Sequence, residues 1–200
     1  MTESSNHLKR IYSPETQKQI KDVLMSVGNF KNEVDAILKQ QNQVVEVSNV
    51  RKTIEKLFLK FHSVAIQLKR RTRNKSPFLI QDEYDVQDLL HALLKIDFTN
   101  IKPEEYCPSY ASVSPRIDFF LKNEQIAIET KMAKKGHGNV KISNELIIDK
   151  EYYQKKSGVA LLYCVVYDPE EIITNPDGFE QDIYEKSEHF EVKVFVIPKR

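Results

Sequence analysis

The first part of the chain, from residue 14 to residue 73, has apolar residues at the spacing of helices. Pro14, with Ser13 before it as a cap, suits the start of the first helix. Apolar residues then follow every three or four positions as far as Gly28-Asn29, a pair that predicts a helix stop. A second helix is expected from about Lys31.

A third helix, expected from about Ser48, has the most regular pattern. Its apolar residues advance by four and three in turn, which is the spacing of a coiled-coil seam: Val50, Ile54, Leu57, Phe61, Val64 and Leu68. Two questions stay open. The third helix either continues the second or is separate from it. The seam packs on the second helix, on the C-terminal domain or on another copy of the chain.

From Phe78 the pattern changes to a mixture of helices and strands. In chain order it predicts a helix over 82–95 capped by Asp82, a short strand around 106–111, two strands over 117–132, a helix over 142–156, a buried central strand over 158–168, a helix over 176–186 and a last strand over 190–198. This order predicts an α/β fold, a mixed sheet flanked by helices, preceded by a coiled-coil-like helical region.

Charge divides the chain at the same place as the pattern. The net charge is +1, but residues 1–77 hold 15 Lys/Arg against 7 Asp/Glu, and residues 78–200 hold 15 against 22. We therefore expect a basic helical region over 1–77, for dimerisation or nucleic-acid contact, and a second domain over 78–200. The basic stretch KRRTRNKSP (69–77) is either a solvated helix end or a contact for phosphates.

The composition is that of a globular protein, with 40% apolar and 30% charged residues. No apolar run approaches the ~20 residues of a membrane span, and the first residues lack the apolar core of a secretory signal. We expect a cytoplasmic protein with no membrane partner. Cys107 and Cys164 match no zinc spacing and are expected to be free thiols.

The two strands over 117–132 pair as a hairpin if their turn lies at Asn123-Glu124. This register sets apolar residues opposite one another: Leu121 and Ile126, Phe119 and Ile128, and Ile117 and Thr130 beyond them. On the other side of the hairpin, Asp118 falls opposite Glu129. Lys131 follows on the same side, two residues along.

Two opposed carboxylates repel each other and need compensation. One interpretation is a site in which Asp118 and Glu129 bind a divalent cation such as Mg²⁺, which prefers carboxylate oxygens. Lys131 would then stabilise negative charge on a phosphate. The alternative is that both acids face water and that Lys131 and Arg116 merely balance them.

The pattern of Asp118 followed after ten residues by Glu129-Thr130-Lys131 resembles the D…E-x-K core of the PD-(D/E)XK nuclease superfamily. The surrounding segments DEYDVQDLLHALL, PSYASVSPRIDFFL, IAIETKMAKKG, ELIID and VYDPEEIITNPDGFEQD resemble the DpnII/MboI-type restriction endonuclease-like domain. The resemblance covers about residues 78–186. Ile117 stands where that motif has proline.

The resemblance implies a restriction-endonuclease-like core and a Mg²⁺-dependent phosphodiesterase acting on DNA, with Mn²⁺ expected to substitute. It implies that Asp118 and Glu129 bind the metal together with the Thr130 carbonyl. It also implies that Lys131 is the catalytic lysine and that Glu83 is a further acid near the metal.

Residues around this core are candidate contacts to nucleic acid. Lys134 and Lys135 could hold phosphates, and Gly136 lets backbone N–H groups approach them. Three further candidates are His137, as a base or a residue that shapes the loop, and Tyr110 and Arg116, which flank the core.

We expect a DNA endonuclease that serves in defence against foreign DNA, with protein partners from such a system. A homodimer through the N-terminal helices is expected because cutting both strands usually takes two active sites. Two alternatives stay open: a non-catalytic module that binds nucleic acid or protein, and a nuclease that acts on RNA.

Overall fold

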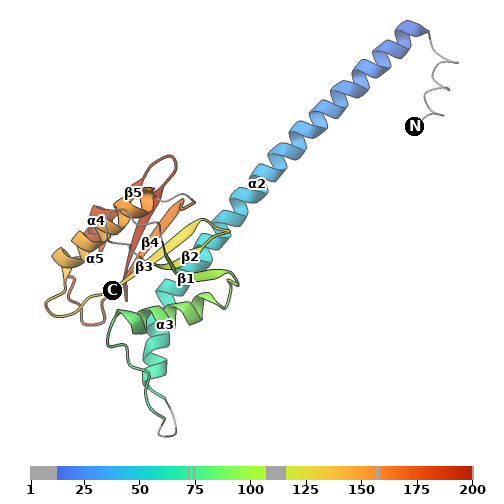
Figure 1. Cartoon of the computed structure of the whole chain (residues 1–200). Coiled ribbons are helices and arrows are strands. Elements are labelled where there is room, and N and C mark those ends of the chain that lie inside the picture. The colour runs from blue at the N-terminus through green and yellow to red at the C-terminus, as the bar shows by residue number, and fades with distance from the viewer. Residues whose placement is uncertain (1–12, 72, 74, 107–115, 156–157, 200) are drawn as a thin grey trace. The chain divides into compact units, whose positions relative to one another are not determined.

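The computed structural model describes residues 13–71, 73, 75–106, 116–155 and 158–199, with the backbone alone at 102–106 and 116. The chain divides into two compact units, Met1–Asn49 and Val50–Arg200. Unit 1 as described is part of one helix, and unit 2 is a sheet with helices (Figure 1). No helix in the described part of the chain combines the length and the apolar character needed to cross a membrane.

The N-terminal helical region is one helix, α2 (Pro14–Lys69). The expected stop at Gly28-Asn29 is wrong. A single glycine costs a helix interior only about 1 kcal/mol, and the apolar spacing continues beyond it. The second and third expected helices are likewise continuous.

The C-terminal part of α2 belongs to the core of unit 2. Ile54, Phe58, Phe61 and Ala65 are buried there, and the Phe58 ring packs edge-on against Tyr163 with centroids 5.3 Å apart. The seam that begins at residue 50 therefore packs on the sheet of its own unit, which settles the second open question. The functional division of the chain between residues 77 and 78 stays a prediction.

Polar contacts join the same part of α2 to the sheet. Arg51 donates to Glu191 at 2.7 Å. Glu55 accepts from the Tyr163 hydroxyl at 2.8 Å and from Lys193 at 3.0 Å. These pairs fix the rotation of α2 about its axis, since a turn of the helix would separate them.

Unit 2 contains a six-stranded sheet in the order β1-β2-β3-β4-β6-β5. Its strands are β1 (Ile101–Tyr106), β2 (Arg116–Leu121), β3 (Ile126–Met132), β4 (Leu161–Tyr167), β5 (Glu185–Lys186) and β6 (Glu191–Ile197). Strands β3, β4 and β6 are parallel, and the other pairs are antiparallel. The mixed α/β fold is confirmed.

Two strands differ from expectation. Strand β1 begins earlier than the strand expected around 106–111, and residues 107–111 lie outside the described part of the chain. Strand β5 was not expected, because two residues are too few to show an alternating pattern.

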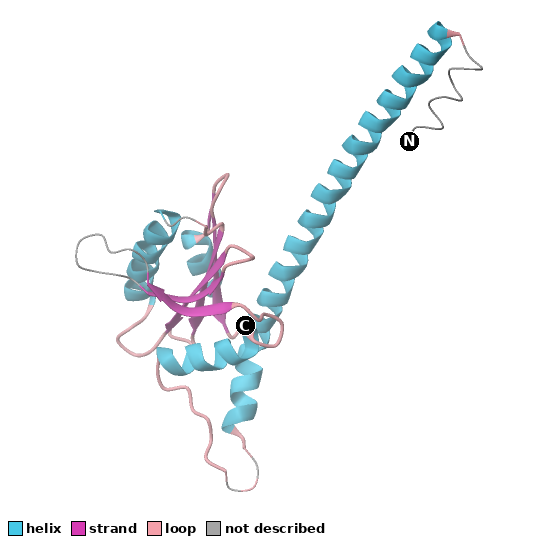
Figure 2. Cartoon of the chain, turned by 45° about the vertical axis from the view of Figure 1, so that its right-hand side comes forward, coloured by secondary structure: helices cyan, strands magenta, loops and turns pink. Residues whose placement is uncertain are grey.

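Helices cover both faces of the sheet (Figure 2). On one face, α3 (Glu83–Leu94) packs with the end of α2. The Asp82 side chain accepts the N–H groups of Tyr84 and Asp85, so its expected cap is confirmed. On the other face lie α4 (Asn139–Lys155) and α5 (Pro176–Ile183).

The burial of Phe58 makes the end of α2 necessary for unit 2. Phe58→Ala should lower the free energy of unfolding by about 3–5 kcal/mol, because it removes a fully buried ring. Leu59→Ala, one residue further on at a side chain that is 54% exposed, should change it by about 0.5 kcal/mol or less. Urea unfolding of the full chain measures both. Equal effects would contradict the packing.

Candidate active site

The hairpin of β2 and β3 has the expected register where its strands pair. Phe119 lies opposite Ile128, and Leu121 lies opposite Ile126. All four side chains are in the cluster beneath α2 and α3. The described ladder ends at Phe119, one residue short of Asp118. The expected pairs of Asp118 with Glu129 and of Ile117 with Thr130 are therefore not part of it.

The alternation of β2 changes at Asp118. Ile117 is buried with the side chains beneath α4 and α5, whereas Phe119 is buried with those beneath α2 and α3. Residues two apart on a regular strand share a face, so this strand turns about its axis where it leaves β3. The turn frees the Asp118 carboxylate to contact the backbone of β3.

Asp118 joins three elements of unit 2. Its Oδ2 accepts from the Thr130 backbone N–H at 2.8 Å and from the Thr130 hydroxyl at 2.6 Å. Its Oδ1 accepts from the Gln87 side-chain amide of α3 at 2.9 Å. These bonds set the position of the carboxylate relative to Glu129 and Lys131 on β3.

Glu129 and Lys131 form a buried ion pair beneath α4. The Lys131 Nζ lies 2.6 Å from Glu129 Oε1, and the Tyr153 hydroxyl of α4 donates to Glu129 Oε2 at 2.6 Å. Glu129 is 5% exposed and Lys131 is 8% exposed. The alternative of acids that simply face water is therefore wrong for Glu129, because α4 covers this part of the sheet.

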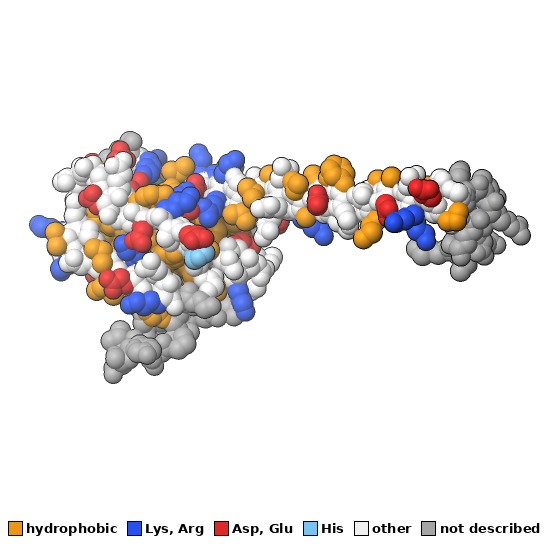
Figure 3. All heavy atoms as spheres, turned by 90° about the horizontal axis from the view of Figure 1, so that it is seen from above, with side chains coloured by type: hydrophobic (Ala, Val, Ile, Leu, Met, Phe, Trp, Pro, Cys, Tyr) orange, Lys and Arg blue, Asp and Glu red, His pale blue; other side chains and the backbone are white. Residues whose placement is uncertain are grey.

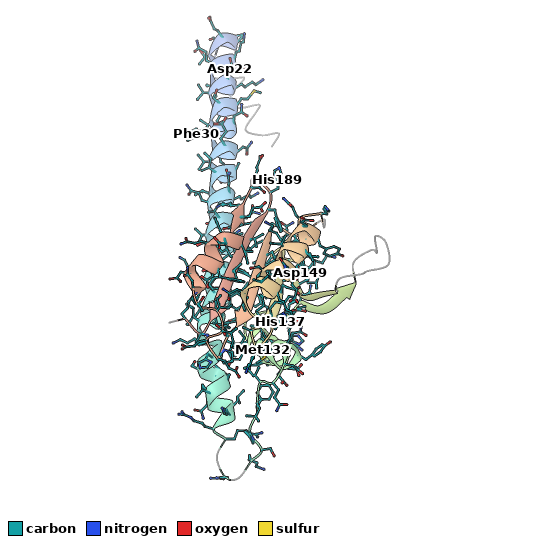
Figure 4. All side chains as sticks on the ribbon, turned by 90° about the vertical axis from the view of Figure 1, so that its left-hand side faces the viewer. Asp22, Phe30, Met132, His137, Asp149 and His189 are labelled. Carbon is teal, nitrogen blue, oxygen red and sulfur yellow. The ribbon has the colours of Figure 1, made fainter. Side chains whose placement is uncertain are left out.

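A second carboxylate, that of Asp149 on α4 (labelled in Figure 4), approaches the same lysine. Its Oδ2 lies 3.2 Å from Lys131 Nζ. Within the described residues, no other donor reaches this buried oxygen of Asp149. Lys131 thus lies between two acids, and one of them retains an unused acceptor.

Glu83 reaches the site from the first turn of α3. Its carboxylate lies near the Met132 backbone and in the electrostatic field of Lys131 and Asp118. Glu145 of α4 also acts on it. The structure therefore brings together four of the residues expected in the site, Glu83, Asp118, Glu129 and Lys131.

Burial dominates the electrostatics of the acids. It raises the pKa of Glu83, Asp118 and Asp149, and burial with the Asp118 charge raises the pKa of Glu129 to about 8. Burial lowers the pKa of Lys131, but the charges of Glu129 and Asp149 outweigh it and raise that pKa overall. The site thus holds an excess of carboxylates around one ammonium group.

The donor set fits a hard divalent cation. A carboxylate has about four lone-pair positions, of which the bonds above use three on Asp118 and two on Glu129. Mg²⁺ is commonly held by one or two carboxylates together with water and substrate phosphates. Among the residues that the structure describes, no three His, Cys, Asp or Glu side chains converge as a metal cluster.

The loop after β3 carries the other candidate contacts. Lys134 and Lys135 are exposed. Gly136 has a φ of +82°, a conformation that favours glycine. His137 Nε2 lies 3.0 Å from Glu145 Oε2. Tyr110 and the Arg116 side chain lie outside the described part of the chain.

Sequence reasoning missed Asp149 and Gln87. Asp149 lies four residues from both Glu145 and Tyr153, so these polar side chains share one line of α4, and that spacing was a usable signal. Gln87 gave no signal, because its contact depends on how α3 lies across the end of β2.

This constellation, two carboxylates and a lysine on adjacent strands of a mixed sheet, is that of a restriction-endonuclease-like domain. The model of the DpnII-MboI restriction endonuclease family matches residues 52–199. The chain belongs to this family, which confirms the resemblance. No curated protein and no solved structure matches the chain.

The raised pKa of Glu129 has a consequence for stability. Between the ordinary pKa of 4.5 and about 8, the folded state holds a proton that the unfolded state has lost. The free energy of unfolding should therefore fall as the pH rises through this range, at a scale of about 1.4 kcal/mol per pKa unit. Glutamine mimics the protonated carboxyl group, so the free energy of unfolding of Glu129→Gln should fall less steeply with pH.

Urea unfolding of the metal-free protein at intervals from pH 5 to pH 9 measures this difference. Glu124→Gln, in the turn of the same hairpin, is the control and should follow the unsubstituted chain. A Glu129→Gln curve parallel to that of the unsubstituted chain would show that Glu129 does not take up a proton on folding.

Proposed function

We propose that the chain is an endonuclease that hydrolyses phosphodiester bonds in DNA and requires a divalent metal ion, with Mg²⁺ as the natural ion and Mn²⁺ able to substitute. The observation that carries this proposal is the group formed by the half-buried Asp118 with the buried Glu129 and Lys131. Family membership supports the reaction class, since the family consists of restriction endonucleases.

Asp118 and Glu129 are the proposed metal ligands, with the Thr130 carbonyl as a third. The hydrogen bonds from Thr130 and Gln87 hold Asp118 in place, and Tyr153 holds Glu129. Both carboxylates are thereby oriented before any ion arrives. A bound ion would supply Lewis-acid chemistry at the scissile phosphate.

Lys131 is the proposed catalytic lysine, and its surroundings indicate its role. Glu129 and Asp149 raise its pKa, so it remains an ammonium group at neutral pH. A protonated lysine cannot accept a proton from water, but it can stabilise the negative charge that develops on the phosphate oxygens. We assign Lys131 to this electrostatic role, and Asp149 to holding its Nζ in position.

Glu83 is the proposed additional acid of the site. Burial raises its pKa and Lys131 opposes that rise, so its charge depends on what else occupies the site. Glu83 lies on α3, as does Gln87, the residue that holds Asp118. The position of α3 therefore determines where the carboxylates of both Glu83 and Asp118 lie.

The loop over 134–137 is the proposed DNA contact. Lys134 and Lys135 would pair with phosphates, and Gly136 and His137 would shape the backbone that approaches them. Arg116 and Tyr110 remain predicted contacts. We further propose a cytoplasmic enzyme, active as a homodimer, that works with protein partners in defence against foreign DNA. The restriction endonuclease family supports this role.

Loss of either Asp118 or Lys131 should abolish cleavage. Asp118→Asn removes a charged metal ligand, and Lys131→Ala removes the ammonium group. Each should lower the rate at least about 100-fold, on the scale of a lost transition-state interaction. Lys122→Ala, at an exposed lysine in the turn of the same hairpin, is the control and should keep full activity.

The assay uses methylated and unmethylated plasmid DNA and a structured RNA, with Mg²⁺ or Mn²⁺. Cleavage of RNA alone would replace the DNA proposal by the RNA alternative. If no substrate is cut by the unsubstituted chain, alone or with the products of neighbouring genes, the protein is a non-catalytic module.

Metal binding should also be visible without catalysis. Mn²⁺ at about 100 times its dissociation constant should raise the free energy of unfolding by about 2.7 kcal/mol. Asp118→Asn should remove this gain, and Glu124→Gln should keep it. Thermal unfolding with and without Mn²⁺ at pH 8 measures the gain. An equal gain for Asp118→Asn would place the ion elsewhere.

A further inference from the structure

The part of α2 that lies in unit 1 carries a row of apolar side chains, all exposed except that of Ile20, which is half-buried. The row advances by three and four residues in turn through Ile20, Val23, Val27, Phe30, Val34, Ile37, the polar Gln41 and Val44. We call these eight residues the N-terminal seam. Val23, Phe30 and Val44 are 61%, 67% and 64% exposed, and Figure 3 shows hydrophobic side chains recurring along this part of the helix.

The same helix shows what such a row does when it is covered. In unit 2, Ile54, Phe58 and Phe61 follow a similar spacing and are fully buried by the sheet. In unit 1, every described residue from 21 to 47 is exposed. The apolar row of α2 is thus covered in unit 2, whereas no described residue covers it in unit 1.

An isolated helix of this sequence would be marginal in water. Most helix stability in proteins comes from packing an apolar face. The region from residue 20 to residue 48 contains Gly28 and many valines, which are weaker helix formers than alanine or leucine. A stable helix over these residues therefore requires a partner that covers the N-terminal seam.

The charges suit a second copy of the same chain. With Ile20 at position a of the heptad and Val23 at position d, the a, d, e and g positions are those that face a partner. Outside these positions lie the charged residues Lys18, Lys21, Asp22, Asp35, Lys39 and Glu46. At those facing positions between residues 19 and 48 the only charged residues are Lys31 and Glu33, of opposite sign. Two identical helices could meet without a row of like charges between them.

The facing positions also supply enough contact. The a, d, e and g positions from Gln19 to Ser48 give about 18 residues on each helix, close to the roughly 20–30 residues a side of a stable interface. At a rise of 1.5 Å per residue, two such helices would run together for about 43 Å.

We propose that residues 20–48 form a parallel, in-register coiled coil with a second copy of this chain. Gln41 determines the direction. At a buried seam position its amide requires a hydrogen-bonding partner. In a parallel pair it meets Gln41 of the other copy, whereas in an antiparallel pair with Val34 opposite Ile37 it would meet Phe30. A polar residue at one such position fixes the register.

The test compares two double variants of the full chain with equal charge and spacing. Val27→Glu/Val34→Glu places two carboxylates in the N-terminal seam. Met25→Glu/Asn32→Glu places two carboxylates, also seven residues apart, on the opposite side of the helix. Light scattering coupled to size exclusion measures the mass of each, and circular dichroism measures the helix content.

The unsubstituted chain and the Met25→Glu/Asn32→Glu variant should have at least twice the 23.4 kDa of a single chain. The Val27→Glu/Val34→Glu variant should have the single-chain mass and less helix, while unit 2 keeps its thermal transition. Either a single-chain mass for the unsubstituted protein at 100 µM or an unchanged mass for the seam variant would overturn the proposal.

A thiol tests the direction of the pair. Gln41→Cys should give a rapid disulfide between two copies on mild oxidation, because a parallel in-register coil sets the two sulfurs side by side. Asn32→Cys, on the outer side, should cross-link slowly. Equal rates would contradict the parallel register.

This inference specifies the interface of the homodimer proposed above. It does not rest on the endonuclease activity, and the two can fail separately. Asp118→Asn should keep the oligomeric mass while it loses cleavage. The seam variant should lose the oligomeric mass while its Mn²⁺-dependent gain in unfolding temperature remains, because the metal ligands all lie in unit 2.

Discussion

The buried pair of Glu129 and Lys131 is the constraint on which the site depends. Two ionisable groups on one strand are withdrawn from water beneath α4, where an unpaired charge would be very costly. Their separation of 2.6 Å makes this burial tolerable, and the hydroxyl of Tyr153 satisfies the second oxygen of Glu129. These contacts thereby fix the end of β3 relative to α4, the helix that covers it. Asp118, held on the Thr130 backbone of the same strand, extends that arrangement to β2.

The negative charge of these carboxylates is incompletely compensated, and this imbalance of charge connects stability with function. Burial raises the pKa of Asp118, Glu129 and Asp149, and a single lysine opposes them all. A protein that needed only a stable fold could replace these acids with apolar residues at little cost. Keeping an excess of acids is reasonable where a cation is to be bound, because the ion supplies the missing charge and the protein need not reorganise to receive it.

Much of this could be predicted from the chain alone, for physical reasons. The register of the hairpin followed from side-chain alternation, since a shift of one residue would move Phe119 and Leu121 out of the core. The helix stop at Gly28-Asn29 failed, because local propensity is weak against a continuous apolar row. The contacts of Asp149 and Gln87 depend on where α4 and α3 cross the strands, and the spacing of residues along one element does not determine this. The burial of Ile54 and Phe58 by the sheet depends on tertiary packing in the same way.

The central claim is that the carboxylates of Asp118 and Glu129 bind one metal ion beside Lys131. Anomalous diffraction from crystals grown with Mn²⁺ tests it most directly. The account predicts one strong peak within about 2.0–2.3 Å of an oxygen of each carboxylate and of the Thr130 carbonyl, where oxygen ligands of such ions lie. Fully occupied manganese elsewhere, with Asp118 and Glu129 contacting only their present protein partners, would contradict it.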